Sequence, residues 1–267
     1  MWTDTHLHLD AQEFQADLPE TIERARNANV NRFVLPAVHP DNFDAVRQLA
    51  HATPGAVYCL GIHPCFVHHC QTDALDILFR QLKAHRGDPL LAAVGEIGLD
   101  GFIENPDWPK QTEFFYAQLR LAKDFDLPVV MHVRKSQDLI LKGLRRFQPC
   151  SGIAHAFNGS FQQAEQFLKL NMCLGFGGAS TFTRARQIRR LVAQMPDEAL
   201  VLETDSPDIP PEWNPKGRNE PANIARIAHV ISQLRQVGLQ SLSEITNQNA
   251  TRVLPALGRT GHGPHCT

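Results

Sequence analysis

The sequence predicts an α/β fold: a (β/α)₈ TIM barrel formed as a single domain, with an extra C-terminal helix. Short apolar runs alternate with segments whose apolar residues recur every three or four positions, which is typical of buried parallel strands followed by amphipathic helices. The alternation repeats eight times within 267 residues, and repeats of this size fit a barrel better than a doubly wound open sheet.

Each repeat begins with an apolar run that we expect to form a strand. The expected strands are 2–8, 32–38, 56–62, 90–97, 128–133, 152–156, 171–176 and 199–204. Helices are expected where apolar residues recur with helical spacing, at Leu18, Ile22 and Ala25; Phe43, Val46 and Leu49; Leu75, Leu78 and Leu82; Phe114, Ala117 and Leu121; Ile140, Leu144 and Phe147; Phe161, Ala164 and Leu168; Ile188, Leu191 and Met195; and Ile224, Ile227, Ile231 and Leu234.

Two capping-box patterns support the positions of the later helices. Ser160 is followed by Gln163, and Ser241 by Glu244, so that each serine could cap a helix that begins after it. The second pattern would open the extra helix, which we expect to run to about Leu257. The sequence therefore predicts one domain over 1–257 and a flexible, Gly-rich tail over 258–267, whose His262, His265 and Cys266 are not expected to be ligands.

The composition excludes several classes of protein. With 43% hydrophobic and 20% charged residues it is that of an ordinary globular protein. The formal net charge of −2 excludes a broad electropositive surface for duplex nucleic acid, so any phosphate binding must be local. Because neither a signal peptide nor a membrane-spanning run is apparent, we expect a cytoplasmic protein without a membrane partner. The six cysteines lack a C-x-x-C pair and are predicted to be free thiols.

The stretch from Asp4 to Asp10 places two histidines on one face of the first expected strand. Side chains alternate along a strand, so Asp4, His6 and His8 should point the same way. Burying these polar groups costs several kcal/mol unless something pairs with them, and a metal ion is an efficient partner for imidazoles. Taken alone, the stretch fits equally a pair of hydrogen-bonded core histidines or a half-exposed edge strand.

The other strand ends favour the metal. Barrel enzymes place their chemistry at the C-terminal ends of the strands, and here these ends carry Glu96, His132, His155 and Asp205. Together with His6 and His8 they exceed what one tetrahedral ion needs, and they would suit two ions about 3.5–4 Å apart, the arrangement that phosphoester hydrolysis requires. Glu96 is the natural bridge, and Asp205 could both bind metal and accept a proton from the attacking water. The ions could be Zn²⁺, Mn²⁺, Mg²⁺ or Ni²⁺.

Basic residues near the expected barrel mouth form two candidate phosphate sites. One follows the seventh strand, with Arg184, Arg186, Arg189 and Arg190, and the other lies in the Pro-rich loop after Asp205, with Lys216, Arg218 and Asn219. Each has a plainer interpretation, a solvated helix face for the first and a simple connection for the second.

The strand-end motifs resemble those of the TatD family of metal-dependent deoxyribonucleases, a branch of the amidohydrolase-like barrels. The matching stretches are Thr5-His6-Leu7-His8, Gly61-Ile62-His63-Pro64, Val94-Gly95-Glu96-Ile97-Gly98-Leu99-Asp100, His132-Val133-Arg134, His155-Ala156-Phe157-Asn158-Gly159 and Leu202-Glu203-Thr204-Asp205-Ser206-Pro207. Family members often carry an aromatic residue directly after the Gly-Leu-Asp segment, whereas here Gly101 precedes Phe102. Asn158 replaces the usual Ser or Thr.

The resemblance implies a role for each strand-end residue. His6, His8 and Asp205 would hold one divalent ion, His132 and His155 the other, and Glu96 would bridge them. His63 and Arg134 would lie near the substrate phosphate. The implied reaction is DNA hydrolysis, trimming single strands from the 3′ end.

Two alternatives remain at this stage. One is hydrolysis of a carboxylic ester or amide, as in D-aminoacyl-tRNA deacylases, although amide-cleaving relatives commonly bridge their metals with a modified lysine where Glu96 stands here. The other is a non-catalytic metal-binding or nucleic-acid-binding protein, against which the intact ligand set argues. The sequence does not determine the oligomeric state.

Overall fold

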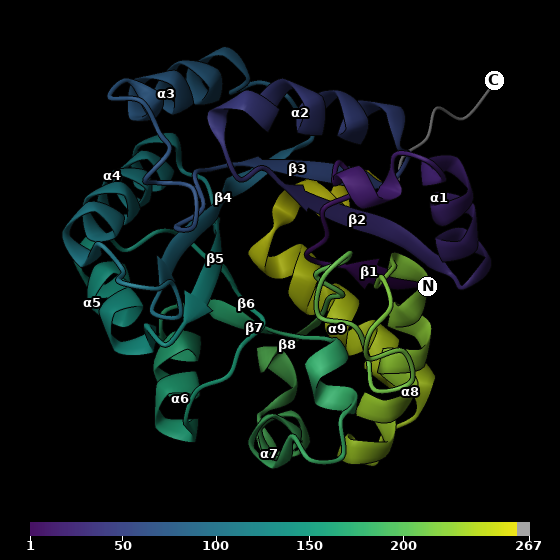
Figure 1. Ribbon diagram of the computed structural model, residues 1–267. Coiled ribbons are helices and arrows are strands. Elements are labelled where there is room, and N and C mark those ends of the chain that lie inside the picture. The colour runs from purple at the N-terminus through teal and green to yellow at the C-terminus, as the bar shows by residue number, and fades with distance from the viewer. Residues whose placement is uncertain (261–267) are drawn as a thin grey trace.

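The computed structural model describes residues 1–260 (Figure 1). His262, His265 and Cys266, and with them most of the predicted tail, lie outside the described residues. The first residues assigned to that tail belong to the fold, because a short 3₁₀ helix covers Pro255–Gly258.

Eight parallel strands form the barrel, in the order in which they occur along the chain. This confirms the predicted (β/α)₈ architecture. The strands are β1 (Trp2–Asp4), β2 (Val30–Pro36), β3 (Ala56–Leu60), β4 (Leu91–Asp100), β5 (Val129–Arg134), β6 (Gly152–His155), β7 (Met172–Phe176) and β8 (Leu200–Leu202).

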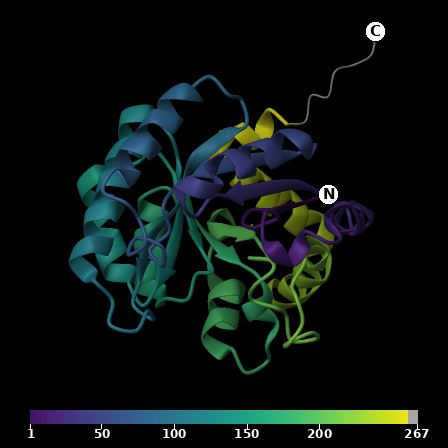
Figure 2. The same ribbon diagram turned by 45° about the horizontal axis from the view of Figure 1, so that its top comes forward.

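The helices surround the strands, as Figures 1 and 2 show from two directions. They are α1 (Leu18–Asn27), α2 (Phe43–Ala52), α3 (Ala74–Ala84), α4 (Trp108–Phe125), α5 (Gln137–Phe147), α6 (Phe161–Lys169), α7 (Arg186–Gln194), α8 (Ile224–Arg235) and α9 (Leu239–Val253). No helix within residues 1–260 is both long enough and apolar enough to cross a membrane.

The extra helix α9 differs from the others in its position, because it lies across the ring of strands rather than around it (Figure 1). Apolar side chains from the barrel interior, among them Val34, Val130 and Val201, form one buried cluster with Val253 and Leu257. The C-terminal segment therefore closes one end of the barrel and completes its inner core.

The predicted caps gave mixed results. Ser160 caps α6 in a complete capping box with Gln163, as expected. The prediction that Ser241 opens the last helix is wrong, because the helix begins two residues earlier, after Gly238 in extended conformation. The helix also ends at Val253 instead of Leu257, since Pro255 follows and the residue before a proline avoids helical geometry.

The barrel closes between β1 and β8 without a regular ladder. Thr5 N–H donates to Leu202 O at 2.9 Å, Asp205 N–H donates to His6 O at 2.8 Å, and an isolated bridge joins Leu7 to Ser206. The expected strand 2–8 is therefore only regular to Asp4. Beyond it the backbone is shared between two neighbours, because Leu7 N–H turns to Val34 O on β2.

Asp4 stabilises this seam, where its carboxylate contacts Thr204 and the backbone of His6. Its carboxylate is fully buried and accepts hydrogen bonds from Thr204 N–H at 2.9 Å, from Thr204 Oγ1 at 2.6 Å and from His6 N–H at 3.3 Å. The side chain thus joins the two ends of the sheet. Burial raises the pKa of the Asp4 carboxyl to about 8, although these bonds oppose the shift.

We predict that Asp4→Asn weakens the pH dependence of stability. A carboxyl whose pKa is raised on folding holds its proton more tightly in the native state, so its contribution is fully favourable below the ordinary value of 3.8 and is lost as pH rises to about 8. The wild-type free energy of unfolding should carry a slope of up to about 1.4 kcal/mol per pH unit from this group. Urea titrations of metal-free protein between these pH values measure the slope. The variant of the exposed Asp41, Asp41→Asn, should keep the wild-type slope, and an equal slope in Asp4→Asn would contradict the prediction.

Candidate metal centre

The barrel brings all six predicted ligands together at the C-terminal ends of its strands. Glu96 lies within β4, His132 within β5 and His155 at the end of β6. His6 and His8 follow β1, and Asp205 follows β8. Seven connections between consecutive parallel strands lie between the first and the last of these residues, so only the closed barrel makes them neighbours.

Glu96 is buried at the centre of the group, with 2% of its surface exposed. Its Oε2 lies 3.1 Å from His6 Nε2 and 3.7 Å from His8 Nε2. Its Oε1 lies 3.1 Å from His132 Nδ1 and 3.9 Å from His155 Nε2. One carboxylate oxygen therefore faces each pair of histidines.

Asp205 faces the same centre from the β8 side of the seam between β1 and β8, whereas His6 and His8 face it from the β1 side. Its Oδ1 lies 3.6 Å from the Nε2 atoms of both His6 and His8, and its Oδ2 lies 3.7 Å from His155 Nε2. Its backbone has a φ of 58°, a left-handed conformation that is strained for a non-glycine residue. The hydrogen bond from its N–H to His6 O fixes this conformation against the other side of the seam.

His63 lies closer to the centre than its predicted role beside the substrate requires. Its Nε2 is 3.4 Å from Glu96 Oε1, and its ring packs edge-on against His132 with centroids 4.3 Å apart. The residue follows β3, so this strand also contributes a side chain to the centre. His63 is thus placed either to contact a bound substrate or to serve as a further cation ligand.

Two further carboxylates hold histidines from behind. Asp100 Oδ2 lies 2.9 Å from His132 Nε2, and Glu203 Oε1 lies 3.1 Å from His155 Nδ1. Such partners fix the orientation and tautomer of a ligating imidazole. Glu203 lies two residues before Asp205 in the same motif, so alternation along a strand can direct both side chains inward, whereas Asp100 stands out in the sequence only as part of a motif.

Glu203 occupies a space that a glycine leaves open. A Cβ atom on Gly175 would lie 1.9 Å from Glu203 Oε2, so no side chain fits at this position of β7 while Glu203 keeps its place. Glu203 Oε1 also accepts a hydrogen bond from Ala156 N–H at 2.6 Å. The carboxylate is therefore held between β7 and the residue that follows β6, and it is directed at His155.

Burial and mutual interactions set the charge of the centre. Burial, followed by repulsion from His155, lowers the pKa of His6 well below its ordinary value, so this ring is neutral. Burial also opposes protonation of His155, but Asp205 and Glu203 outweigh it and raise its pKa to about 10. Burial raises the pKa of Glu96, yet the facing imidazoles reverse this effect and lower it well below its ordinary value. The centre thus combines a neutral imidazole, a protonated imidazole and an ionised carboxylate.

This donor set fits divalent cations. Three groups of donor atoms each lie within 4.8 Å of one another, and His6 or Glu96 belongs to every group. The groups are His6, His8 and Glu96; His6, His155 and Asp205; and His63, Glu96 and His132. A cation would replace the proton that His155 otherwise carries and would compensate the buried carboxylates.

The predicted phosphate-handling residues divide into two kinds. Arg134 is exposed at the end of β5, on the same side of the barrel as the donors. Arg218 instead pairs with Asp17 at 2.6 Å and packs over Phe14, and Asn219 is buried, where its Nδ2 donates to Thr204 O. The loop after Asp205 is therefore anchored to the barrel, in agreement with the plainer interpretation of a connection.

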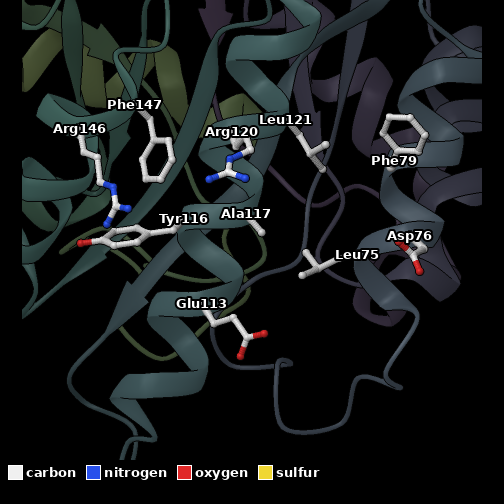
Figure 3. A pocket seen from close by; sticks show the side chains of 10 residues that line it. All are labelled: Leu75, Asp76, Phe79, Glu113, Tyr116, Ala117, Arg120, Leu121, Arg146 and Phe147. Carbon is white, nitrogen blue, oxygen red and sulfur yellow. The ribbon is translucent and has the colours of Figure 1, made fainter.

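A separate groove of about 510 Å³ lies on the outside of the barrel, between α3, α4 and α5 (Figure 3). Phe79, Tyr116 and Phe147 line it together with charged residues such as Arg120. None of its lining residues contributes to the centre. The groove therefore has no part in the chemistry at the barrel mouth.

Comparison with known proteins adds a family relationship to this geometry. The family model of TatD-related DNases matches residues 3–255. The metal-dependent hydrolase YjjV of Escherichia coli K12 is 36% identical over 247 residues, which cover 92% of this chain and 95% of that protein. The human deoxyribonuclease TATDN3 is 32% identical, with 95% and 94% covered.

A solved structure supports the same relationship. The crystal structure of YjjV, described as a TatD homologue from Escherichia coli K12, superposes with a TM-score of 0.91 at 34% identity, covering 95% of this chain and 98% of that one. The agreement extends over the whole barrel.

We predict that divalent cations stabilise the protein through Glu96. A ligand present at about 100 times its Kd stabilises by about 2.7 kcal/mol, which for a chain of this size corresponds to a rise in Tm of roughly 5–10 °C. Chelator-treated protein should show this rise when Zn²⁺ or Mn²⁺ is added, and Glu96→Gln should lose most of it. Differential scanning fluorimetry measures both, with the exposed Glu113→Gln as the matched control. An undiminished rise in Glu96→Gln would refute the central role of this residue.

We also predict that Glu203→Gln weakens cation binding by about 10- to 100-fold, the usual effect of removing a partner that orients a ligand. Gln keeps the size of the side chain and can still accept from Ala156 N–H, but it no longer places a negative charge behind His155. Isothermal titration calorimetry with Mn²⁺ measures the affinity. The exposed Glu198→Gln should bind like wild type, and an unchanged Kd in Glu203→Gln would show that the residue does not support the centre.

Proposed function

Because the chain belongs to the TatD-related DNase family of metal-dependent hydrolases, we propose that it hydrolyses phosphodiester bonds of DNA at a centre of two divalent cations. The human relative TATDN3 is named a deoxyribonuclease. The observation that carries the proposal is the division of the Glu96 carboxylate, whose two oxygens face separate pairs of histidines.

We assign the donors to the two cations as the family resemblance implies, and the distances around Glu96 and Asp205 support this assignment. Glu96 would bridge the two cations. His6, His8 and Asp205 would hold one cation, and His132 and His155 the second, where His63 lies close enough to assist. The mixed imidazole and carboxylate set accepts Zn²⁺, Mn²⁺, Ni²⁺ or Mg²⁺.

Divalent cations at such a site polarise a phosphoryl oxygen and lower the pKa of a bound water. The chain itself supplies the proton acceptor. Asp205 has a pKa of about 6, raised by burial and only partly lowered by His155 and His8, so that it is ionised at neutral pH and close to the pKa range of an efficient base. Asp205 accordingly accepts the proton of the attacking water through a carboxylate oxygen.

The substrate binds at the mouth with its phosphate toward His63 and Arg134. Arg134 carries its charge at the exposed end of β5, two residues after His132. The formal net charge of −2 does not favour binding along a long duplex, and we take the end of a single strand as the substrate. We therefore propose 3′-to-5′ exonuclease activity on single-stranded DNA.

The proposal predicts that the purified protein shortens a 5′-labelled single-stranded oligonucleotide into a ladder of labelled fragments when Mg²⁺, Mn²⁺ or Zn²⁺ is present. Asp205→Asn removes the proton acceptor and should lower kcat/KM by about 10²- to 10⁴-fold. Gel electrophoresis of timed samples measures the rate. Asp208→Asn, an exposed neighbour in the same loop, serves as the matched control and should retain the wild-type rate.

The pattern of products separates the alternatives. A phosphorothioate linkage at the 3′ end should block the ladder, whereas release of the 5′ label as the first product would contradict the proposed direction. DNA that stays intact with every cation, together with deacylation of D-aminoacyl-tRNA by the same preparation, would replace the nuclease by the ester hydrolase considered from the sequence.

A further inference from the structure

Three residues beside the centre form a surface of which the hydrolytic site described above uses only Arg134. Phe102 lies in the turn after β4, and Arg134 and Lys135 end β5 and follow it. The Phe102 ring is 53% exposed although it is large and apolar. Arg134 Cζ lies 4.3 Å and Lys135 Nζ 3.7 Å from the centroid of the ring. We call these three residues the mouth platform.

Both basic side chains of the mouth platform, those of Arg134 and Lys135, are available to bind an anion. Both side chains are exposed, and each lies against the Phe102 ring. The aromatic ring restricts their motion without neutralising them, since a cation over an aromatic face keeps its charge. The loss of freedom that would accompany anion binding is thereby reduced.

The local backbone is built to keep these residues together. Lys135 has a φ of 51°, a left-handed conformation that is unfavourable for lysine and that directs its side chain back over the turn after β4. Gly101 N–H donates to Arg134 O at 2.7 Å. A Cβ atom on Gly101 would lie 3.0 Å from both Cβ and O of Lys135, so a side chain at this position would crowd the two segments.

The mouth platform is tied to the candidate metal centre by one carboxylate. Asp100 Oδ1 accepts a hydrogen bond from Phe102 N–H at 2.6 Å, while Oδ2 of the same group contacts His132 Nε2 at 2.9 Å. The turn that carries the aromatic ring is therefore positioned relative to a candidate ligand. A DNA strand whose reacting phosphate lies at the centre would place its next nucleotide over the Phe102 ring.

We propose that the mouth platform binds the nucleotide next to the scissile phosphodiester, with a base against Phe102 and the adjoining phosphate between Arg134 and Lys135; the proposal rests on the nuclease function above. An exposed aromatic ring beside basic side chains is the pattern by which proteins bind single-stranded nucleic acid without reading its sequence. A duplex keeps its base faces stacked inside the helix. The mouth platform accordingly selects unpaired strands over duplex and over small phosphodiesters.

The first test compares two substrates that need the same chemistry. The measured quantity is kcat/KM for a single-stranded oligonucleotide divided by kcat/KM for bis(p-nitrophenyl) phosphate. This ratio should fall at least about fivefold in Phe102→Leu, because stacking one base on an aromatic ring contributes about 1–3 kcal/mol. The loss should appear as a higher KM for the oligonucleotide. Phe102→Tyr should restore the ratio. Lys135→Gln should reduce the slope of log affinity against log salt by about 0.7, the value for one phosphate contact on a single strand.

Matched controls lie far from the barrel mouth. Phe79→Leu removes an exposed ring from the outer groove (Figure 3), and Lys142→Gln removes an exposed cation from α5. Both should keep the wild-type ratio. An unchanged ratio in Phe102→Leu would overturn the proposal, as would equal losses for the two substrates, since these would indicate damage to the metal centre.

A binding measurement separates this proposal from the nuclease function. Fluorescence anisotropy with a labelled phosphorothioate oligonucleotide, which resists hydrolysis, reports binding without turnover. Binding that weakens in Phe102→Leu and Lys135→Gln supports the mouth platform even if no cleavage is found, in which case only the nuclease function fails. Absence of oligonucleotide binding by the wild-type protein overturns the mouth platform itself.

Discussion

The burial of Glu96 among imidazoles is the constraint on which the rest of the centre depends. An isolated carboxylate taken out of water is destabilised by several kcal/mol, and His6 and His132 reduce that penalty from opposite sides at 3.1 Å. The two histidines cannot both stabilise the carboxylate by becoming protonated, because burial and repulsion from His155 keep the pKa of His6 low. Divalent cations satisfy the carboxylate and the neutral rings at once. The same concentration of donors that is costly in a cation-free fold is therefore suited to holding divalent cations.

The barrel holds these donors through bonds that lie outside the centre. Asp4 joins β1 to β8 through Thr204, so the residues on either side of the seam, His6 and Asp205, keep their relative position. At the other end, α9 fills the barrel interior and gives the strands a core to pack on. Sites carried by strands with such support are more precise than sites on free loops. Stability and function are thus linked here, because a shift of the seam would move two candidate ligands.

The strand-end residues could be found from sequence because barrel topology turns distant positions into neighbours, and the alternation of apolar runs with helical spacing already predicts that topology. What could not be found depends on tertiary partners. The expected fourth strand stopped at Ile97, whereas β4 continues to Asp100, which pairs with Arg134 of β5 and thereby reaches His132. Ser241 has the residue type of a cap, but the chain already enters the helix at Leu239. Propensity marks possible starts, and packing selects among them.

The chemistry of the centre does not by itself determine the substrate. Cations held by imidazoles and carboxylates can activate water against a phosphoryl group or an acyl carbon, so selectivity must come from the groups around the mouth. One basic candidate near the mouth is already neutralised, because Arg218 is paired with Asp17. Arg134 and Lys135 are exposed and lie over one exposed ring. A surface made of one aromatic ring and two basic side chains suits one or two unpaired nucleotides.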